Sequence, residues 1–249
     1  QSTHSGSRRA KSVSARFSLD QQIAVVTGAS GKLGAIWVEA LVDAGARVAA
    51  LDLGTAVPTP RFEEVRHRVG EGVQCFDCDI TNRASIEAAA VSVTARMGEP
   101  SILVNNAGID QPPDSPGGRH HLEDLPIDQF RHMVEVNLLG TFQVTQVFGE
   151  RMADRGGGSI INIGSLYASV SPDPRFYDHI VSDPPFLKPP AYGASQAAAL
   201  TLQKHLATGW GRSGVRVNTL SPGGGLGAQD DQFKKKFCDR VPLGRMAVY

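Results

Sequence analysis

The phenol of Tyr192 is the side chain of this sequence best suited to acid–base chemistry. Residues four apart on a helix are neighbours, so Gln196 should lie beside it if the segment is helical. A phenol with a pKa of about 10 exchanges protons at neutral pH only when its surroundings lower that value. The neutral amide of Gln196 cannot lower it by charge. The alternative is a buried tyrosine at a helix start without a chemical role.

The segment after this tyrosine has helical periodicity. Apolar side chains recur at helical spacing, which predicts a helix from Tyr192 to about Trp210. Its apolar positions are Ala194, Ala197, Ala198, Leu202 and Leu206.

A glycine-rich loop between a buried strand and a helix is the second candidate for a ligand site. Ile23–Val26 is continuously apolar, as in a strand buried on both faces, and an amphipathic helix ends near Ala44. Glycines allow the backbone to approach a pyrophosphate, and the helix N-terminus offers free N–H groups. This context predicts a dinucleotide-binding loop with the residues Gly28, Ser30, Gly31, Lys32, Leu33 and Gly34.

Asp52 follows a second apolar strand, Arg47–Leu51, and stands 18 residues beyond Gly34. A carboxylate at this place hydrogen-bonds the adenosine ribose hydroxyls of NAD and repels the 2′-phosphate of NADP. Lys32 favours NADP instead, because its charge would attract that phosphate. The carboxylate stands where the phosphate would have to lie, so we expect NAD rather than NADP.

Further apolar runs alternate with helical patterns along the chain. This alternation predicts an α/β fold with a doubly wound parallel sheet of the Rossmann type, as a single domain over residues 18–249. Ligands of such sheets bind at the carboxyl ends of the strands. The other expected elements are helices near Arg61–Arg68, Asn82–Met97 and Ile127–Arg151, and strands Val73–Cys78, Ile102–Val104, Ser159–Ile163 and Arg216–Leu220.

Charge and cysteine content exclude several kinds of partner. Lys plus Arg and Asp plus Glu both number 25, so no net charge favours nucleic acid or an anionic membrane. No apolar run reaches the roughly 18 residues of a membrane span. Cys75, Cys78 and Cys238 are unlike a disulfide framework, and one C-x-x-C pair does not complete a zinc site. We expect a cytoplasmic protein without a metal.

The first 17 residues are rich in serine and contain four lysine or arginine residues, without an acid or an apolar run. The missing hydrophobic segment excludes a secretory signal. We expect a flexible leader here.

Together these motifs resemble the short-chain dehydrogenase/reductase family. The resemblance covers roughly residues 18–246 and implies an NAD(P)-dependent oxidoreductase that moves a hydride between an alcohol carbon and a nicotinamide. Family members continue beyond Tyr249, so we expect a domain truncated at its C-terminus, with its last strand missing. The residues that carry the resemblance are Gly28, Gly31, Gly34, Asp52, Asp79-Ile80, Asn105-Asn106-Ala107-Gly108, Asn137 and Tyr192.

The same resemblance implies roles for individual residues. Tyr192 is implied as the general acid/base and Ser165 as the residue that orients the substrate oxygen. Asn137 is implied as a proton relay, with a polar kink in a helix as the alternative. Gln196 stands where the family carries a lysine that holds the nicotinamide ribose and lowers the tyrosine pKa. The residues implied to contact or support the cofactor include Asp79, Ile80, Asn106, Ala107, Gly108, Pro222 and Gly223.

The segment between Ser165 and Tyr192 departs from the family pattern. The two residues are 27 positions apart, about twice the family's usual interval, and many prolines lie between them. We interpret this loop as a wall of the substrate site, with a harmless excursion as the alternative. It is similar to members that act in sugar or surface-glycan biosynthesis. Its candidate substrate contacts are Tyr167, Phe176, Tyr177 and His179.

Two features follow the last strand. Gly224, Gly225 and Gly227 predict a flexible, lid-like segment, and Lys234–Lys236 predicts a solvated helix face.

The sequence therefore predicts an NAD-dependent dehydrogenase acting on a small alcohol or ketone that resembles a sugar or polyol. A second hypothesis is a catalytically impaired homologue that binds dinucleotide for regulation or assembly, which Gln196 favours. A third is a nucleotide-sugar epimerase or dehydratase, which the glycine spacing favours but the chain length does not. By the resemblance, the helices bearing Asn137 and Tyr192 pair with their copies, which predicts a homodimer.

Overall fold

The computed structural model describes residues 17–111 and 119–248, so the leader expected over residues 1–17 lies outside it except for Phe17. Six parallel strands form one sheet in the order β3-β2-β1-β4-β5-β6. Their bounds are β1 Ile23–Thr27, β2 Arg47–Asp52, β3 Val73–Asp77, β4 Ile102–Asn105, β5 Gly158–Ile163 and β6 Val215–Leu220. The predicted doubly wound α/β fold is confirmed.

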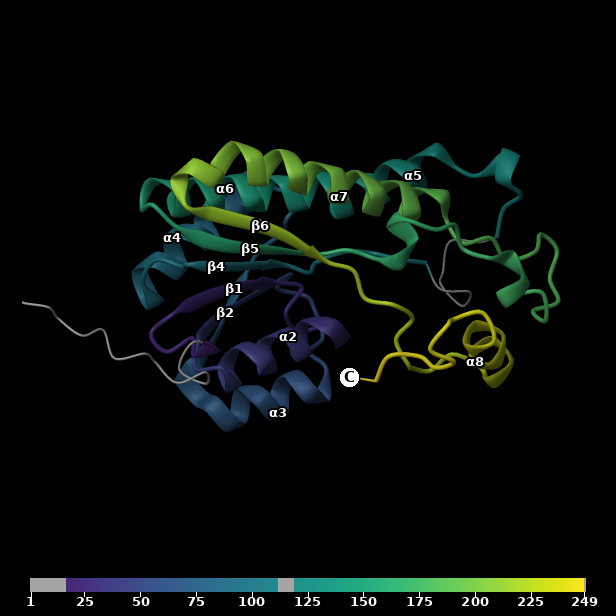
Figure 1. Ribbon diagram of the computed structural model, residues 1–249, viewed down its shortest axis with the longest axis horizontal. Helices are drawn as coiled ribbons and strands as arrows, with labels where there is room; N and C mark the ends of the chain where they lie inside the picture. The colour runs from purple at the N-terminus through teal and green to yellow at the C-terminus, as the bar shows by residue number, and fades with distance from the viewer. Residues whose placement is uncertain (1–16, 112–118, 249) are drawn as a thin grey trace, which may run out of the picture.

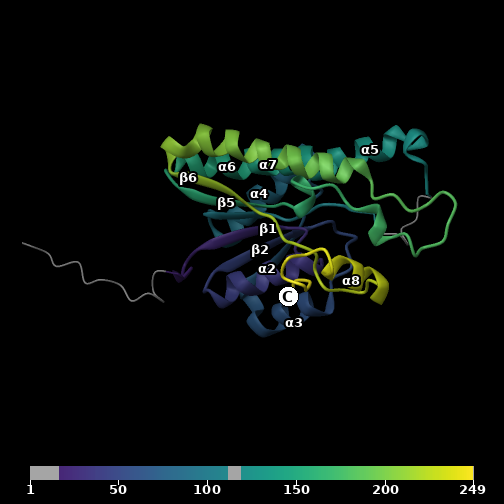
Figure 2. The same ribbon diagram turned by 45° about the vertical axis from the view of Figure 1, so that its right-hand side comes forward.

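Helices cover both faces of the sheet. Figures 1 and 2 show α2 and α3 on one face, and α4, α6 and α7 on the other. The bounds of the longer helices are α2 Lys32–Asp43, α3 Pro60–Val69, α4 Arg83–Met97, α5 Ile127–Val134, α6 Thr141–Asp154, α7 Pro190–Trp210 and α8 Asp231–Cys238. The short 3₁₀ helices are η1 Gly70–Gly72, η2 Leu122–Asp124, η4 Leu166–Ala168, η5 Pro174–Phe176 and η6 Gly211–Ser213.

The central strands are mostly apolar because each face packs against helices. Along β1, Val25 belongs to the core beneath α4 and α6, whereas Ala24 and Val26 belong to the core beneath α2 and α3. Successive side chains of a strand point to opposite faces, so a strand between two helical layers needs apolar residues at every position. None of the helices in the described ranges has the length and hydropathy required to cross a membrane.

The helix expected over Ile127–Arg151 is interrupted by a π-helical segment. α5 continues directly into η3 (Glu135–Gly140), which is π-helical and leads into α6. Asn137 lies within η3 and is buried. Single π turns often occur at functional sites, because the extra residue redirects a side chain.

The buried positions of α7 coincide only in part with its apolar positions, of which Leu206 packs against the core. The helix begins at Pro190, two residues earlier than expected, and Ala194 is exposed. Its buried positions are Ala191, Ser195, Gln196 and Ala199. Two polar side chains therefore belong to the inward stripe, which a search for apolar residues alone does not detect.

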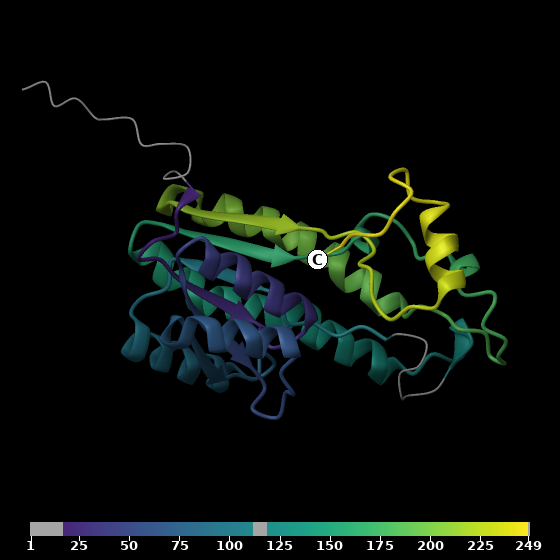
Figure 3. The ribbon, with the colours of Figure 1, turned by 90° about the horizontal axis from the view of Figure 1, so that it is seen from below.

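A third apolar cluster lies beyond the carboxyl ends of the strands. There α8 packs against the long loop between β5 and α7, as Figures 1 and 3 show. The cluster is largely aromatic and consists of Phe176, Tyr177, Phe186, Phe233, Phe237 and Met246. It is separate from the two cores of the sheet.

The glycine-rich segment before α8, which the sequence predicts to be flexible, contacts the C-terminal part of the chain at two points. Gly225 forms a β-bridge with Ala247. A Cβ on Gly224 would lie 2.3 Å from the Phe237 ring. The glycine at position 224 is thus required by the close approach of α8 to its own N-terminal segment.

Candidate active site

A cavity of about 580 Å³ opens at the carboxyl ends of β1, β2 and β4. This volume is within the range of small-molecule sites. The cavity brings together the loops that the sequence predicted to converge. Its lining includes Gly28, Ser30, Gly31, Lys32, Leu33, Gly34, Asp52, Asp79, Ile80, Asn106, Ala107 and Gly108.

Two glycines of the first loop are required by close packing. Gly28 has φ +59°, and a Cβ there would lie 2.8 Å from the Cα of Ala107. A Cβ on Gly34 would lie 2.1 Å from the carbonyl oxygen of Gly28. Gly31 differs, since the nearest atom to its added Cβ would be at 3.4 Å. The loop is therefore packed closely against α2 and against the turn that follows β4.

Asn106 ties the two loops together. Its Nδ2 donates to the carbonyls of Thr27 at 3.1 Å and Gly28 at 3.0 Å. Trp37 Nε1 donates to its Oδ1 at 2.9 Å. Thr27 Oγ1 accepts from the backbone N–H groups of Asn106 and Ala107 at 3.0 Å each. Thr27 and Trp37 were not predicted as site residues, because their partners are distant in the sequence.

Asp52 lies at the end of β2 with its carboxylate tied to the glycine loop. The carboxylate accepts from the backbone N–H and the hydroxyl of Ser30, the former at 3.0 Å, and from the Leu53 N–H at 3.0 Å. The group is thereby fixed in direction on the cavity wall.

Asp79 and Ile80 form another part of the cavity wall. Asp79 Oδ1 accepts from the backbone N–H of Thr81 at 2.9 Å and its hydroxyl at 2.7 Å. Ile80 packs against Gly140, where an added Cβ would lie 2.9 Å from Ile80 Cδ1. The π-helical η3 therefore lies against this wall.

Ser165 and Tyr192 lie together although they are distant in sequence. Ser165 follows β5, is buried, and accepts from the Tyr167 N–H at 3.1 Å. Burial raises the pKa of Tyr192, a side-chain hydrogen bond with Ser165 lowers it, and the Asp110 carboxylate raises it further. Tyr192 is thus a protonated phenol at neutral pH in this chain.

Asn137 connects the turn after β4 to α7. Its Oδ1 accepts from the Ile109 N–H at 2.8 Å, and its Nδ2 donates to the Ile109 carbonyl at 2.9 Å. Nδ2 also lies 3.3 Å from Ser195 Oγ, which donates to the Tyr192 carbonyl at 2.9 Å. The asparagine lies in the π turn, and its amide binds both backbone polar groups of Ile109.

Gln196 is 8% exposed, and its Oε1 has no hydrogen-bond partner within residues 17–111 and 119–248. A buried acceptor without a donor is costly unless a ligand supplies one. Ribose hydroxyls are such donors. Together with the close-packed glycine loop, this acceptor fits a bound dinucleotide.

Pro222 and Gly223 do not line the large cavity, and neither do Ser165, Tyr192 and Gln196. Pro222 lies beside Ser165, since its carbonyl accepts from the Leu166 N–H at 3.3 Å. Gly223 is exposed, with open space where a Cβ would be.

A second cavity of about 580 Å³ lies at the mouth of the site, against the long loop and the start of α7. Tyr167 and Tyr177 line it, and the rings of Tyr167 and Tyr192 meet edge-on at 6.4 Å. Phe176 and His179, the other predicted contacts, do not line it. Phe176 is buried in the cluster under α8, and His179 Nε2 lies 2.9 Å from Asp230.

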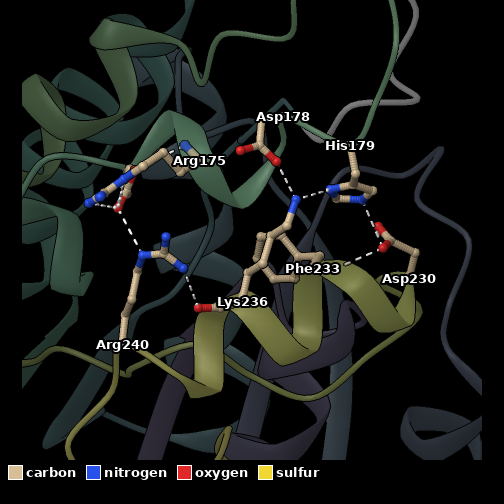
Figure 4. A network of polar contacts seen from close by, with 8 residues as sticks. Arg175, Asp178, His179, Asp230, Phe233, Lys236 and Arg240 are labelled. Carbon is tan, nitrogen blue, oxygen red and sulfur yellow. Dashed lines mark hydrogen bonds and ion pairs between the residues drawn. The ribbon is translucent and has the colours of Figure 1, made fainter.

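Charged residues join α8 to the long loop (Figure 4). Lys236 donates to Asp178 and lies 3.1 Å from His179 Nδ1. Arg240 Nε lies 3.2 Å from Asp173. Lys236 was expected on a solvated face, but this residue faces the loop.

The C-x-x-C pair does not form a reactive site. Cys75 is exposed, whereas Cys78 is buried, and burial raises the pKa of the Cys78 thiol to about 12. In the described part of the chain, no group of three or more His, Cys, Asp or Glu is placed to hold a metal ion.

Comparison with known proteins agrees with this geometry. A family model described as enoyl-(acyl carrier protein) reductase matches residues 28–248. D-threitol dehydrogenase of Mycolicibacterium smegmatis is 35% identical over 245 residues, which are 95% of this chain and 84% of that protein. The chain belongs to the short-chain dehydrogenase/reductase family. It is an NAD(P)-dependent dehydrogenase or reductase that acts on alcohols.

Other short-chain dehydrogenases/reductases support the assignment. Galactitol 2-dehydrogenase of Rhizobium johnstonii is 32% identical over 83% of this chain and 73% of its own. A short-chain dehydrogenase of Leptospira borgpetersenii, solved with bound NAD+, is 30% identical with a TM-score of 0.79, covering 99% of this chain and 87% of its own. A gluconate 5-dehydrogenase of Burkholderia cenocepacia, solved with NADP and tartrate, has a TM-score of 0.77 at 28% identity, with coverages of 94% and 86%.

Proposed function

We propose that this protein is an NAD-dependent dehydrogenase that transfers a hydride between a secondary alcohol carbon of a polyol or sugar-like substrate and the nicotinamide. The main support is the pairing of the Ser165 hydroxyl with the Tyr192 phenol, together with a separate cavity of dinucleotide size that the glycine loop lines. Bound NAD supplies the hydride acceptor or donor. The chain's own residues hold the substrate and move the proton.

Tyr192 is the proposed general acid/base. In carbonyl reduction the protonated phenol donates to the substrate oxygen, and in alcohol oxidation the phenolate takes that proton. Ser165 donates to the same oxygen and orients it. Because burial raises the pKa of Tyr192, the acid form predominates at neutral pH, so reduction is favoured over oxidation there.

Gln196 and Asn137 are proposed to position these groups. Gln196 Oε1 would accept from the nicotinamide ribose, which satisfies its missing donor. Asn137 holds the segment at Ile109, and through Ser195 it contacts the first turn of α7 that carries Tyr192. Its role as a proton relay remains part of the proposal.

NAD is proposed over NADP because of Asp52. The carboxylate is held in direction by Ser30 and faces the cavity at the end of β2. A negative charge there accepts from ribose hydroxyls and repels a 2′-phosphate.

A polyhydroxylated substrate is supported by the mouth cavity and by the relatives. Hydroxyl-bearing residues line the cavity, among them Tyr167, Ser169 and Ser171. Two relatives are named for threitol and galactitol. Multiple hydroxyls on a substrate would find donors and acceptors along this wall.

The test is NADH formation from NAD with a panel of tetritols, pentitols, hexitols and aldonates. We expect turnover with at least one, and a loss of about 100-fold or more in kcat for Tyr192→Phe. Tyr167→Phe is the comparison variant: it removes a neighbouring hydroxyl of the substrate wall but keeps the proposed acid/base, so its effect should fall on the substrate KM rather than on kcat. NADH binding without turnover of any substrate would instead favour a regulatory, non-catalytic role.

A further inference from the structure

Lys188 is a cation turned into the protein beside the proposed acid/base. Its side chain is 10% exposed, and its Nζ lies over the ring of Tyr192, 5.1 Å from the centroid. The same Nζ lies 5.9 Å from the ring centroid of Tyr167. A lysine so buried requires a reason, because its ammonium loses hydration.

Asp110 pairs with this ammonium from the turn that follows β4. The two side chains differ in exposure, 10% for Lys188 and 38% for Asp110. The negative charge is therefore better screened by water, while the positive charge faces the phenol rings. Asn137 fixes the neighbouring Ile109 and so helps hold Asp110 in place.

The position of Lys188 in the chain makes its placement rigid. Pro189 and Pro190 follow it directly, and α7 begins at Pro190. Proline fixes its own φ and restricts the residue before it. The backbone of Lys188 is therefore restricted just before the helix that carries Tyr192.

We propose that Lys188 supplies the positive charge that stabilises the Tyr192 phenolate during alcohol oxidation, and that Asp110 positions Lys188 and tempers its charge. This inference rests on the proposed function of Tyr192. Gln196, the neighbour of Tyr192 on α7, has no charge to offer. An ammonium near a partly buried phenol acts through a low effective dielectric, so one charge changes the proton equilibrium about tenfold or more.

Other titratable groups near Tyr192 do not supply this charge. Tyr167 and Tyr177 are neutral phenols whose pKa is raised by burial, to about 12 for Tyr167. The elements packed against α7 also carry charged groups. In α5, Asp128 pairs with Arg131 and His132 lines the cofactor-sized cavity, and Glu135 begins η3.

The experiment compares Lys188→Met and Asp110→Asn with native protein in pH profiles of NAD-dependent oxidation. We expect Lys188→Met to move the midpoint up by about one pH unit and to lower the rate at pH 7 about tenfold. Asp110→Asn should move the midpoint down. Lys188→Arg should keep the native profile. The double variant Lys188→Met with Gln196→Lys should return the midpoint toward its native value. Lys204→Met, an exposed lysine of the same helix, is the control.

The opposite signs separate this role from a structural one. Both variants break the ion pair, so a purely structural pair predicts shifts in the same direction, which would overturn the proposal. A change in the substrate KM with an unmoved midpoint would also overturn it, since Lys188 would then contact substrate only.

A second readout does not depend on turnover. Near-ultraviolet absorbance titration, with Tyr192→Phe subtracted, measures ionisation of Tyr192 directly, and circular dichroism checks the fold at each pH. The same opposite shifts are expected. If no alcohol is oxidised, the proposed function fails, while this titration still decides whether Lys188 and Asp110 act on Tyr192.

Discussion

Tyr192 and Gln196 lie one helical turn apart near the start of α7, and both side chains are largely shielded from solvent. The phenol's pKa is raised mainly by burial, and Gln196 brings only a neutral amide. A proton acceptor in such a place needs a cation nearby, so a charge added at position 196, in addition to the one proposed for Lys188, should have a large effect on the chemistry.

Gln196→Lys tests that variable. A charge about 6–7 Å from a phenolate at an effective dielectric near 20 contributes roughly 2–3 kcal/mol, on the order of two pKa units. Native oxidation should be slow at pH 7 and increase into alkaline pH, because only the deprotonated phenol accepts the proton. The variant should oxidise ten- to a hundredfold faster at pH 7, about 1.4–2.7 kcal/mol of barrier.

The measurement is a pH–rate comparison of native protein and this variant with NAD. Gln196→Met is the control, since it removes the ribose acceptor without adding charge and should weaken NAD binding only. An unchanged rate and profile in Gln196→Lys would mean that position 196 does not face the phenol.

Asp52 is the residue expected to set cofactor preference. Native protein should bind NAD(H) at least tenfold more tightly than NADP(H), a difference of about 1.4 kcal/mol. Asp52→Asn keeps the shape but removes the charge, so this ratio should decrease. Calorimetric titration with both cofactors measures it, and Lys32→Met should change it in the opposite direction. Equal affinities in the native protein would refute the assignment.

α8 and the long loop between β5 and α7 form one element-scale unit. Their aromatic side chains pack with each other, and Lys236 and Arg240 pair with acids of the loop. Tyr177 belongs to this cluster and also lines the mouth cavity. The substrate wall therefore depends on the packing of α8.

Phe237→Ala should loosen this unit without unfolding the sheet. Phe237 is buried, and truncation of a buried phenylalanine costs about 3–5 kcal/mol. Because the cluster is separate from the sheet cores, we expect faster hydrogen exchange in α8 and the loop and a higher substrate KM. Phe62→Ala in α3 is the control. The stability that this variant loses should appear as a lower midpoint of the main unfolding transition, that of the sheet. Equal loss of protection in α8 and the sheet would contradict the separation.

At the scale of the whole molecule, α5 and α7 pack together on the outer side of the sheet (Figure 1). Apolar side chains remain exposed along this side, including Ile127 in α5 and Leu139 in η3. Such a surface suits an isologous contact with a second copy of the chain.

We predict a homodimer through these helices. Light scattering at micromolar concentration should give twice the mass of the chain, and Leu139→Glu should shift the equilibrium toward monomer by placing a charge in the contact. Val91→Glu, at an exposed apolar position of α4, should leave the dimer intact. A native monomer or a tetramer would disprove this arrangement.

The sequence alone determined the sheet and the glycine loop, whereas the cofactor roles of Asp79, Ile80, Asn106, Ala107 and Gly108 were implied by the family resemblance. The sheet and the loop are local features, because a continuous apolar run of four residues such as Ile23–Val26, or a strand–glycine–helix succession, carries its own signal. The same holds for Tyr192 near the start of a helix, although the apolar pattern did not indicate that Ser195 and Gln196 are buried.

Tertiary structure alone decided which polar residues meet. Lys188 and Asp110 are 78 positions apart, and no periodicity connects them. Phe176 and His179 were predicted to face substrate, but packing with α8 turned them away. The π turn that places Asn137 is likewise a product of packing. Contacts between distant segments depend on how whole elements pack, and neither residue spacing nor composition predicts which of these segments meet.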